Sequence, residues 1–185
     1  MPNVSNVSTG KPKVAGAVYR APVGTTLPTD PSTALDNAFV DMGYISEDGV
    51  TNANGPTTET VKDWGGRPVL VLTTERPDNF TLKFIEALNA NVLKAVYGDA
   101  NVAVAAQTGA ISVTVVDADQ VESSYVIDMI MRGGALKRIV IPNAMLGEMA
   151  DIVYKADEAV GYEVTLSALL DSAGASHYEY ILPAD

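Results

Sequence analysis

Few side chains in this sequence could carry out covalent chemistry or hold a metal ion. The 185-residue chain has no cysteine and one histidine, His177, which excludes a thiol nucleophile, a disulfide framework and cysteine-rich or histidine-rich metal sites. A serine–histidine–aspartate nucleophile would have to use His177, which stands between Ser176 and Tyr178. The alternation around it favours the plainer interpretation, an ordinary and partly exposed strand histidine.

The carboxylates do not form a recognisable catalytic or metal-binding pattern. Asp117 and Asp119 flank Ala118 at an expected bend and could touch a cation, but calcium prefers six to eight oxygen ligands and this spacing offers two. Phosphate-binding glycine loops, zinc-protease motifs and nucleophile elbows do not occur. We therefore expect no metal and no cofactor. An enzyme is the least favoured class, and an acidic-pair hydrolase is its only plausible form.

The charge of the chain argues against a protein that grips nucleic acid. With 12 basic and 23 acidic residues the net charge is −11, which repels a phosphate backbone. The charge is also uneven, because residues 1–29 carry three bases and no acid, whereas residues 142–185 carry one base and eight acids. This asymmetry suggests that one end of a subunit meets the other end of a neighbouring copy.

The elements around these residues are mostly short strands, bounded by glycine, proline and asparagine. In residues 80–85, Phe80, Leu82 and Phe84 alternate with polar side chains, as on a half-buried strand. Strands are predicted over 14–20, 69–74, 80–85, 111–117, 123–131, 136–141, 162–170 and 177–182. Pro142 and Asn143 are expected to end the strand before them. Residues 149–155 form either a further strand or part of a short helix over 143–152, and residues 34–45 are left open.

One helix is predicted, over residues 86–97. Apolar residues recur there at helical spacing, including Leu88 and Val92. Glu86 suits the positive end of the helix dipole, Lys94 suits the negative end, and Gly98 is placed for a C-terminal cap. We expect this helix to pack on the core.

Two segments lack a hydrophobic period. Residues 1–13 are small and polar and are predicted to be a flexible arm, ahead of a single domain over 14–185. Residues 46–66 form a long polar loop, a kind of segment that is uncommon in compact domains and usually functional. Trp64 in this loop either tucks into its own domain or anchors a partner, and the sequence favours neither interpretation.

The fold class that follows is mainly β, a β-sandwich or open barrel with one flanking helix and a long loop. No apolar run approaches the length of a membrane helix. The N-terminal residues lack the apolar segment of a secretory signal. We therefore expect the protein to fold in the cytoplasm, away from membranes.

Four segments resemble the major tail tube protein of long-tailed bacteriophages, in particular those of Gram-positive hosts. They are VSTGKPKVAGAVYRAPVGTTLP at 7–28, FVDMGYISEDGVT at 39–51, PDNFTLKFIEALNANVLKAVYG at 77–98 and VIPNAMLGEMADIVYKADEAVGYEVTLSALLD at 140–171. Their order and spacing carry the resemblance over nearly the whole chain.

The resemblance implies a structural protein of the virion without catalytic residues. Such subunits are β-sandwiches that form hexameric rings, and the rings stack into a tube held together by long loops and terminal arms. DNA and the tape measure protein occupy an acidic channel, and the tube ends meet a tail terminator and baseplate or tail-tip proteins. Assembly would take place in the cytoplasm of the host bacterium. DNA would be cargo that does not stick.

The resemblance and the charge pattern together nominate candidate residues. The candidates for contacts between rings or subunits are Lys11, Lys13, Asp48, Glu59, Lys62, Trp64 and Arg67. The candidate channel-facing acids are Asp128, on the face that also carries Ser124 and Val126, and Glu163, on the face with Thr165 and Ser167. The alternative function is a non-catalytic β-sandwich module of the virion surface that recognises host carbohydrate, which an exposed Trp64 and abundant Asn and Thr would suit.

Overall fold

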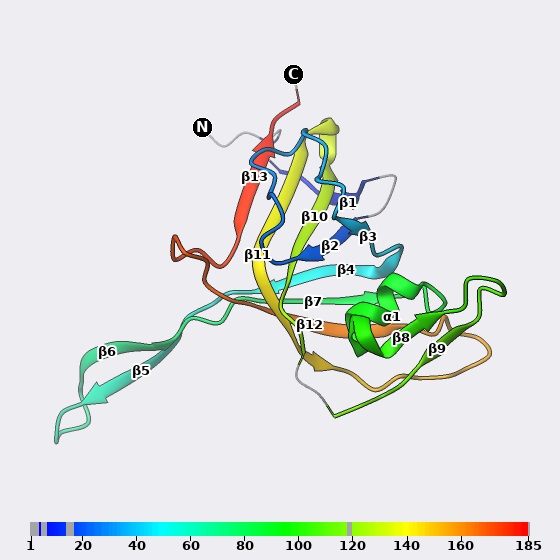
Figure 1. Cartoon of the computed structure of the whole chain (residues 1–185). Helices are drawn as coiled ribbons and strands as arrows, with labels where there is room; N and C mark the ends of the chain where they lie inside the picture. The colour runs from blue at the N-terminus through cyan, green and yellow to red at the C-terminus, as the bar shows by residue number, and fades with distance from the viewer. Residues whose placement is uncertain (1–3, 5–6, 14–16, 118–119, 185) are drawn as a thin grey trace.

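The computed structural model describes residues 4, 7–13, 17–117 and 120–184. Figure 1 shows a mainly β molecule with the single helix α1 on one side. Most of the arm predicted over 1–13 is described, but residues 14–16 of the strand predicted over 14–20 lie outside the described residues, as do Ala118 and Asp119.

Nine strands form one antiparallel sheet in the order β3-β2-β10-β11-β12-β7-β4, with β1 also pairing with β10 and β13 with β11. The bounds are β1 Gly10–Pro12, β2 Val18–Pro22, β3 Val40–Asp41, β4 Ile45–Ala53, β7 Asn79–Phe84, β10 Ser123–Met131, β11 Leu136–Met149, β12 Tyr162–Ala168 and β13 Tyr178–Leu182. The remaining elements are β5 Thr57–Lys62 paired with β6 Pro68–Glu75, β8 Val102–Val104 paired with β9 Ile111–Val113, α1 Ala90–Tyr97 and the short 3-10 turns η2 Asp99–Asn101 and η3 Arg132–Gly134.

The sheet folds over along β11, so that its two halves face each other. Strands β4, β7 and β12 run across the molecule in Figure 1, whereas β10, β11 and β13 rise steeply past them. The main core lies between these halves and includes Ile127 and Ile141 from one half, Phe80 and Leu166 from the other, and Val92 from α1. The expected β-sandwich with one flanking helix is confirmed.

Strand β11 corrects the expectation that Pro142 and Asn143 end a strand. Tyr125 opposes Ile141 and Ser123 opposes Ala144, so Pro142 and Asn143 together oppose Ser124 in a β-bulge. A proline is tolerated there because a bulge does not require its missing N–H. Strand β11 then continues to Met149 against β12, and neither a helix over 143–152 nor a strand over 149–155 forms.

The period-two strands are confirmed in the lower half of the sheet. Phe80, Leu82 and Phe84 are buried in β7, while β12 buries alternate residues from Tyr162 to Leu166. The pattern stops earlier than expected, because β12 ends at Ala168 and Leu170 is exposed.

Strand β10 departs from simple alternation because both of its faces are covered. Its second face is covered by the segment that follows β2, where Phe39 and Leu35 pack with Val126 and Val140 in a small cluster. The first six residues of β10 are therefore all buried. The expectation that Ser124, Val126 and Asp128 form an outward face is wrong in the single chain.

The helix is shorter than predicted. Asn89 caps it by accepting a hydrogen bond from the Asn91 backbone N–H at 2.9 Å, and α1 begins at Ala90. Glu86 lies outside the helix, where its carboxylate accepts hydrogen bonds from the Tyr44 backbone N–H at 2.9 Å and the Asn89 side chain at 2.8 Å. Leu88, expected on the apolar stripe, is 89% exposed. Gly98 does cap the C-terminus, with a φ of 93° and its N–H donating to the Lys94 carbonyl.

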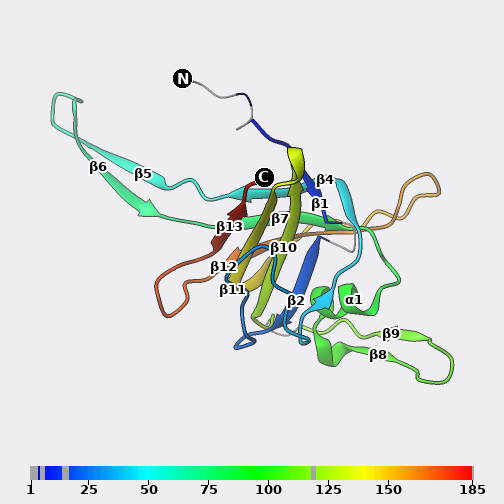
Figure 2. The same cartoon turned by 90° about the horizontal axis from the view of Figure 1, so that it is seen from above.

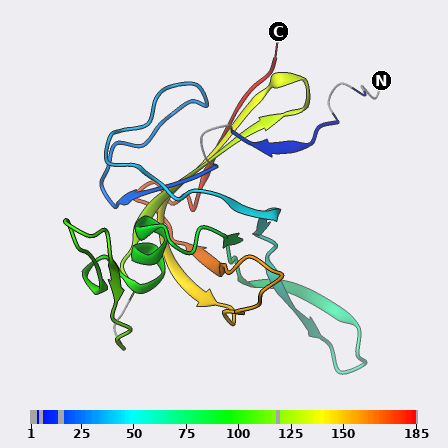
Figure 3. The same ribbon diagram turned by 90° about the vertical axis from the view of Figure 1, so that its right-hand side faces the viewer.

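The predicted loop over 46–66 consists largely of strands. Most of β4 and all of β5 fall inside it, and β5 pairs with β6 to form a two-stranded ribbon. Alternating Thr, Glu and Val in β5 carry a strand pattern that the surrounding polar residues conceal. Figures 2 and 3 show this ribbon projecting well away from the sheet, on the side opposite the β8–β9 hairpin.

Candidate assembly surfaces

The most prominent candidate surface is the ribbon formed by residues 54–76, here called the arm. Every residue of β5 and β6 is exposed in the single chain. Trp64, in the turn between the two strands, is fully exposed. The interpretation that Trp64 tucks into its own domain is therefore wrong in the single chain, and its ring is free to contact another molecule.

The tip of the arm has a defined shape. The Asp63 N–H donates to the Arg67 carbonyl at 2.9 Å, and the Asp63 carboxylate accepts from the Arg67 N–H at 2.8 Å. Gly66, with a φ of 81°, completes the turn. Among the described residues, the exposed side chains of Glu59, Lys62 and Arg67 take part in no ion pair. These three charges are available at the surface.

The base of the arm is held by Asp78. Its buried carboxylate accepts hydrogen bonds from the Asn52 side chain at 2.7 Å and from the Ser176 hydroxyl at 2.5 Å, and it pairs with Nδ1 of His177 at 2.5 Å. Burial raises the pKa of Asp78, but the hydrogen bonds from Ser176, Asn52 and His177 outweigh burial and leave that pKa below its ordinary value. Asp78 thus connects the two chain segments at the base of the arm, β4 and the segment before β7, to the C-terminal segment.

The same contacts decide the role of His177. Its ring packs edge-on against Phe80, with 5.3 Å between ring centroids. A nucleophilic serine would donate to the histidine ring, but the Ser176 hydroxyl and His177 both point at Asp78. The histidine lies just before β13 and serves a structural contact.

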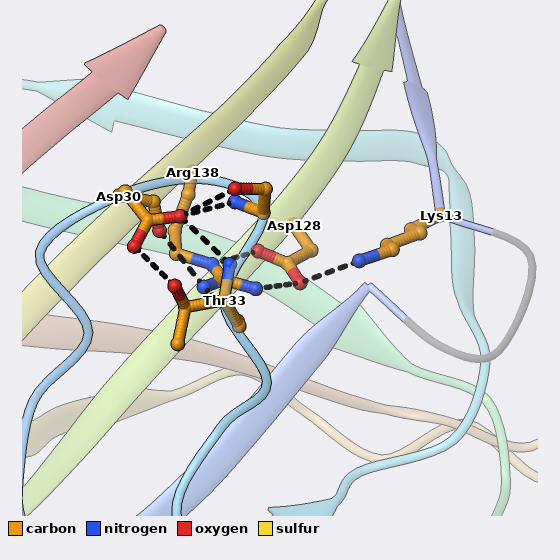
Figure 4. Close-up of polar contacts among 6 residues, drawn as sticks. Lys13, Asp30, Thr33, Asp128 and Arg138 are labelled. Atoms are coloured by element: carbon orange, nitrogen blue, oxygen red, sulfur yellow. Dashed lines mark hydrogen bonds and ion pairs between the residues drawn. The ribbon is translucent and has the colours of Figure 1, made fainter. Parts of the chain in front are cut away.

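Asp128 lies inside the protomer, where Arg138 neutralises it (Figure 4). Arg138 donates to the two carboxylate oxygens of Asp128 at 2.6 and 2.8 Å and to the backbone carbonyls of Asp30 and Thr33 at 2.9 and 2.8 Å. Both charged side chains are almost completely buried, and Lys13 approaches Asp128 at 3.7 Å. The carboxylate of Asp128 therefore does not face outward, which corrects its nomination as a channel-facing acid.

Sequence reasoning did not find Arg138, although a signal for it exists. Asp128 and Arg138 are directly opposed across the β10–β11 hairpin, and a tight turn at Arg132, Gly133 and Gly134 between the two predicted strands would place these two positions opposite each other. Their opposite charges then predict a cross-strand pair. Its burial could not be foreseen, because the covering segment around Asp30 is distant in sequence.

A second missed arginine, Arg20, joins three parts of the sandwich. Its guanidinium forms a bidentate pair with Asp99 at 3.0 and 2.8 Å, and its Nε donates to the Ser123 hydroxyl at 2.9 Å. Hydrogen bonds from Arg20 lower the pKa of Asp99. These contacts fix η2 against β2 and β10 and are structural.

The remaining candidates lie on the strands of the sheet. Lys11 is exposed on β1, opposite Ile130. Asp48 is exposed on β4, where the Ser46 hydroxyl donates to it at 3.0 Å. Lys11 and Asp48 line one shallow pocket, whereas Lys13 contacts Asp128 of its own chain.

Glu163 lies on a polar face formed by β4, β7, β12 and the second half of β11. It is exposed, it opposes Lys83 across the β7–β12 pair, and it lines a shallow hollow with Glu148 and Thr165. Lys83 itself pairs with Glu158 at 3.4 Å. This face combines hydroxyl groups and carboxylates with the ammonium group of Lys83, and Met149 also lines the hollow.

Charge separates the arm from the rest of the molecule. The arm contains three acids and three bases and so has no net charge, which leaves the full −11 on the remaining residues. The six charged residues of the arm are Glu59, Lys62, Asp63, Arg67, Glu75 and Arg76. The residues outside the arm are here called the body. The bodies of two copies repel each other, whereas an uncharged arm can approach either body.

The sequence matches the family model of the phage tail tube protein over residues 11–184. The chain belongs to the phage tail tube protein family. This family is structural and builds the tube of the virion tail, so the protein is a virion component that assembles with itself and is not an enzyme. No curated protein matches the sequence.

Two further observations concern the described part of the tail tube protein. No helix within it is long and apolar enough to cross a membrane. Within the same residues, no three histidine or carboxylate side chains gather closely enough to hold a metal ion.

Proposed function

We propose that this tail tube protein forms hexameric rings that stack into a tube around an acidic channel, through which DNA passes. The observation that carries the proposal is the arm, an exposed two-stranded ribbon with apolar side chains and no core of its own. An isolated two-stranded ribbon is at best marginally stable in water, and exposed apolar patches commonly mark contact surfaces. Neighbouring copies are the cover that a tube would supply.

The open borders of the main sheet support the same arrangement. Among the described strands, β13 and β4 each lie at a border and pair on one side only. Such borders present unpaired backbone groups, which a closed ring of subunits would satisfy. Ile181 on β13 is exposed as well, which adds apolar area to that border.

We place the channel wall on the polar face that carries Glu163 and Glu148. Carboxylates repel DNA phosphates, hydroxyl groups such as that of Thr165 add no positive charge, and the ammonium group of Lys83 is paired with Glu158. The absence of attraction lets DNA slide as cargo. The tape measure protein would fill the same channel before the DNA, and a tail terminator and baseplate or tail-tip proteins would meet the tube ends.

The contacts between subunits are assigned to the arm and the N-terminal segment. Glu59, Lys62, Trp64 and Arg67 would meet a neighbour through the arm, and Asp48 lies on the strand that leads into it. Lys11 would meet the acidic C-terminal part of another copy, whereas Lys13 would have to exchange its contact with Asp128. In this proposal residues 14–185 form the domain and residues 1–13 form a separate N-terminal segment. Assembly takes place in the host cytoplasm.

The test is an assembly experiment with an arm-deleted variant. Removing residues 56–75 leaves a short connection between the paired residues Ala53 and Asn79 and retains Asp78. We expect wild-type protein to form hollow tubes in negative-stain micrographs, and the deleted protein to fold but remain unassembled. Tubes at wild-type yield from the deleted protein would contradict the role of the arm. Glycan binding by a monomeric wild-type protein would favour the carbohydrate-binding alternative.

The channel assignment has its own test. Glu163→Lys adds a positive charge to the proposed wall, so phage carrying it should assemble normal tails but eject DNA more slowly, with the defect strongest at low salt. Asp117→Lys is the control, because Asp117 is exposed and lies in the loop after β9, outside the main sheet. Equal ejection rates for the wild type and Glu163→Lys would exclude this face as the wall.

A further inference from the structure

Strand β6 has the apolar sequence that is typical of a strand covered on both faces. Its residues 69–74 read VLVLTT, in which four successive side chains are apolar. Near-continuous apolar runs are typical of strands that other elements cover on both faces, whereas one-sided strands alternate. In the single chain all eight residues of β6 are nevertheless exposed. The apolar run therefore has no partner within its own chain.

The register of the ribbon assigns these side chains to two opposite faces. Val61 opposes Leu70 and Glu59 opposes Leu72, which places Leu70 and Leu72 on the first face. Thr60 opposes Val71, which places Val71 on the second face, whereas Val69 lies at a bulge, where the register shifts between Val61 and Lys62. The exposed fractions are 52% and 45% for Leu70 and Leu72 and 62% and 61% for Val69 and Val71. Both faces of β6 therefore carry exposed apolar side chains.

We propose that assembly buries both faces of β6, with the arm held between two different copies of the chain. This inference rests on the proposed function and goes beyond it, because an arm that lies on the surface of one neighbour would cover one face only. The first copy covers Leu70 and Leu72, and the second covers Val71.

The occupants are copies of this chain because the family assembles with itself and because the charges permit it. Each body has a net charge of −11 and repels other bodies, while the arm has no net charge. An uncharged ribbon between two acidic bodies separates them and supplies apolar area to both. Each arm contact then involves three chains, namely the chain that carries the arm and the two copies that cover its faces. Contacts between the acidic parts outside the arm are not enough to build the tube.

The first experiment introduces one lysine on each face. Leu70→Lys and Val71→Lys should each lower the tube yield at least about tenfold, because an unpaired ammonium group is costly to bury. Both variants should keep the wild-type melting temperature, since neither position belongs to the core. Wild-type tube yield from either variant would show that its face stays open and would overturn the proposal.

The second experiment counts the copies around one arm. A chain with photo-cross-linking residues at both positions 70 and 71 is mixed sparsely into wild-type protein, assembled and irradiated. Products of three chains are expected from the doubly substituted chain, and products of two chains from each singly substituted control. Only two-chain products from the double variant would assign both faces to one neighbour and overturn the proposal. A wild-type protein that never forms tubes would overturn both this inference and the proposed function.

Discussion

Replacing Arg138 with methionine should destabilise the protomer strongly, because it leaves the carboxylate of Asp128 buried without its partner. Arg138 makes four hydrogen bonds, two to Asp128 and one each to the carbonyls of Asp30 and Thr33. The remaining cation, Lys13, is 3.7 Å from Asp128 and partly exposed. Breaking a buried ion pair in this way costs about 3–5 kcal/mol of unfolding free energy.

The effect is measured by thermal and urea unfolding of the unassembled protein, followed by circular dichroism. For a chain of this length, each kcal/mol lowers the melting temperature by roughly 2–4 °C, so a fall of roughly 6–20 °C is expected. The double variant Asp128→Leu/Arg138→Met should recover much of the loss, because two apolar side chains leave no buried charge. The two carbonyls of the covering segment stay unpaired in both variants.

The neighbouring residue offers a matched control. Lys137 on the same strand pairs with Glu179 at 2.8 Å, but this pair is much more exposed. Lys137→Met should therefore cost less than about 1 kcal/mol. If Arg138→Met unfolds like the wild type yet fails to form tubes, Asp128 acts between subunits and the buried-pair reasoning is refuted.

Two further predictions concern the arm. Asp78→Asn should lower the melting temperature at pH 7, and the difference from the wild type should shrink on acidification. The folded-state pKa of Asp78 lies below its ordinary value of 3.8. The stabilisation by the Asp78 carboxylate is therefore complete above pH 3.8 and is lost as the pH falls through the folded-state pKa. Melting curves between pH 7 and pH 2 check this, and a constant difference would contradict it. Trp64→Ala should change unfolding free energy by less than about 0.5 kcal/mol while reducing tube yield in micrographs; a parallel loss of both would place the ring in a core contact.

Local patterns in the sequence were sufficient for several elements. Phe80, Leu82 and Phe84 alternate in β7 as predicted, because the period of a strand is set by its own backbone. Gly98 ends α1 as predicted, since a residue with positive φ favours glycine whatever surrounds it. The overall class, a β-sandwich with one helix, follows from the number and spacing of such signals.

Other features depended on contacts between distant residues. Helix α1 begins at Ala90 because Asn89 caps it, whereas Glu86 instead accepts a hydrogen bond from the backbone N–H of Tyr44, a distant partner that no local pattern indicates. The proline at position 142 reads as a strand end until its opposition to Ser124 turns it into a bulge. In each case the partner lies far enough away in sequence that its position depends on the fold.

The sequence by itself determined several strands, the excess of acidic charge and the family, because these depend on residue types and their order. Only the tertiary structure decided which faces are covered. The sequence predicts Asp128 on an outward strand face and Trp64 in a polar loop, yet Asp128 lies buried against Arg138 and Trp64 is fully exposed at the tip of the arm. The physical reason is that alternation assigns a side chain to a face, whereas burial depends on what the rest of the chain places over that face.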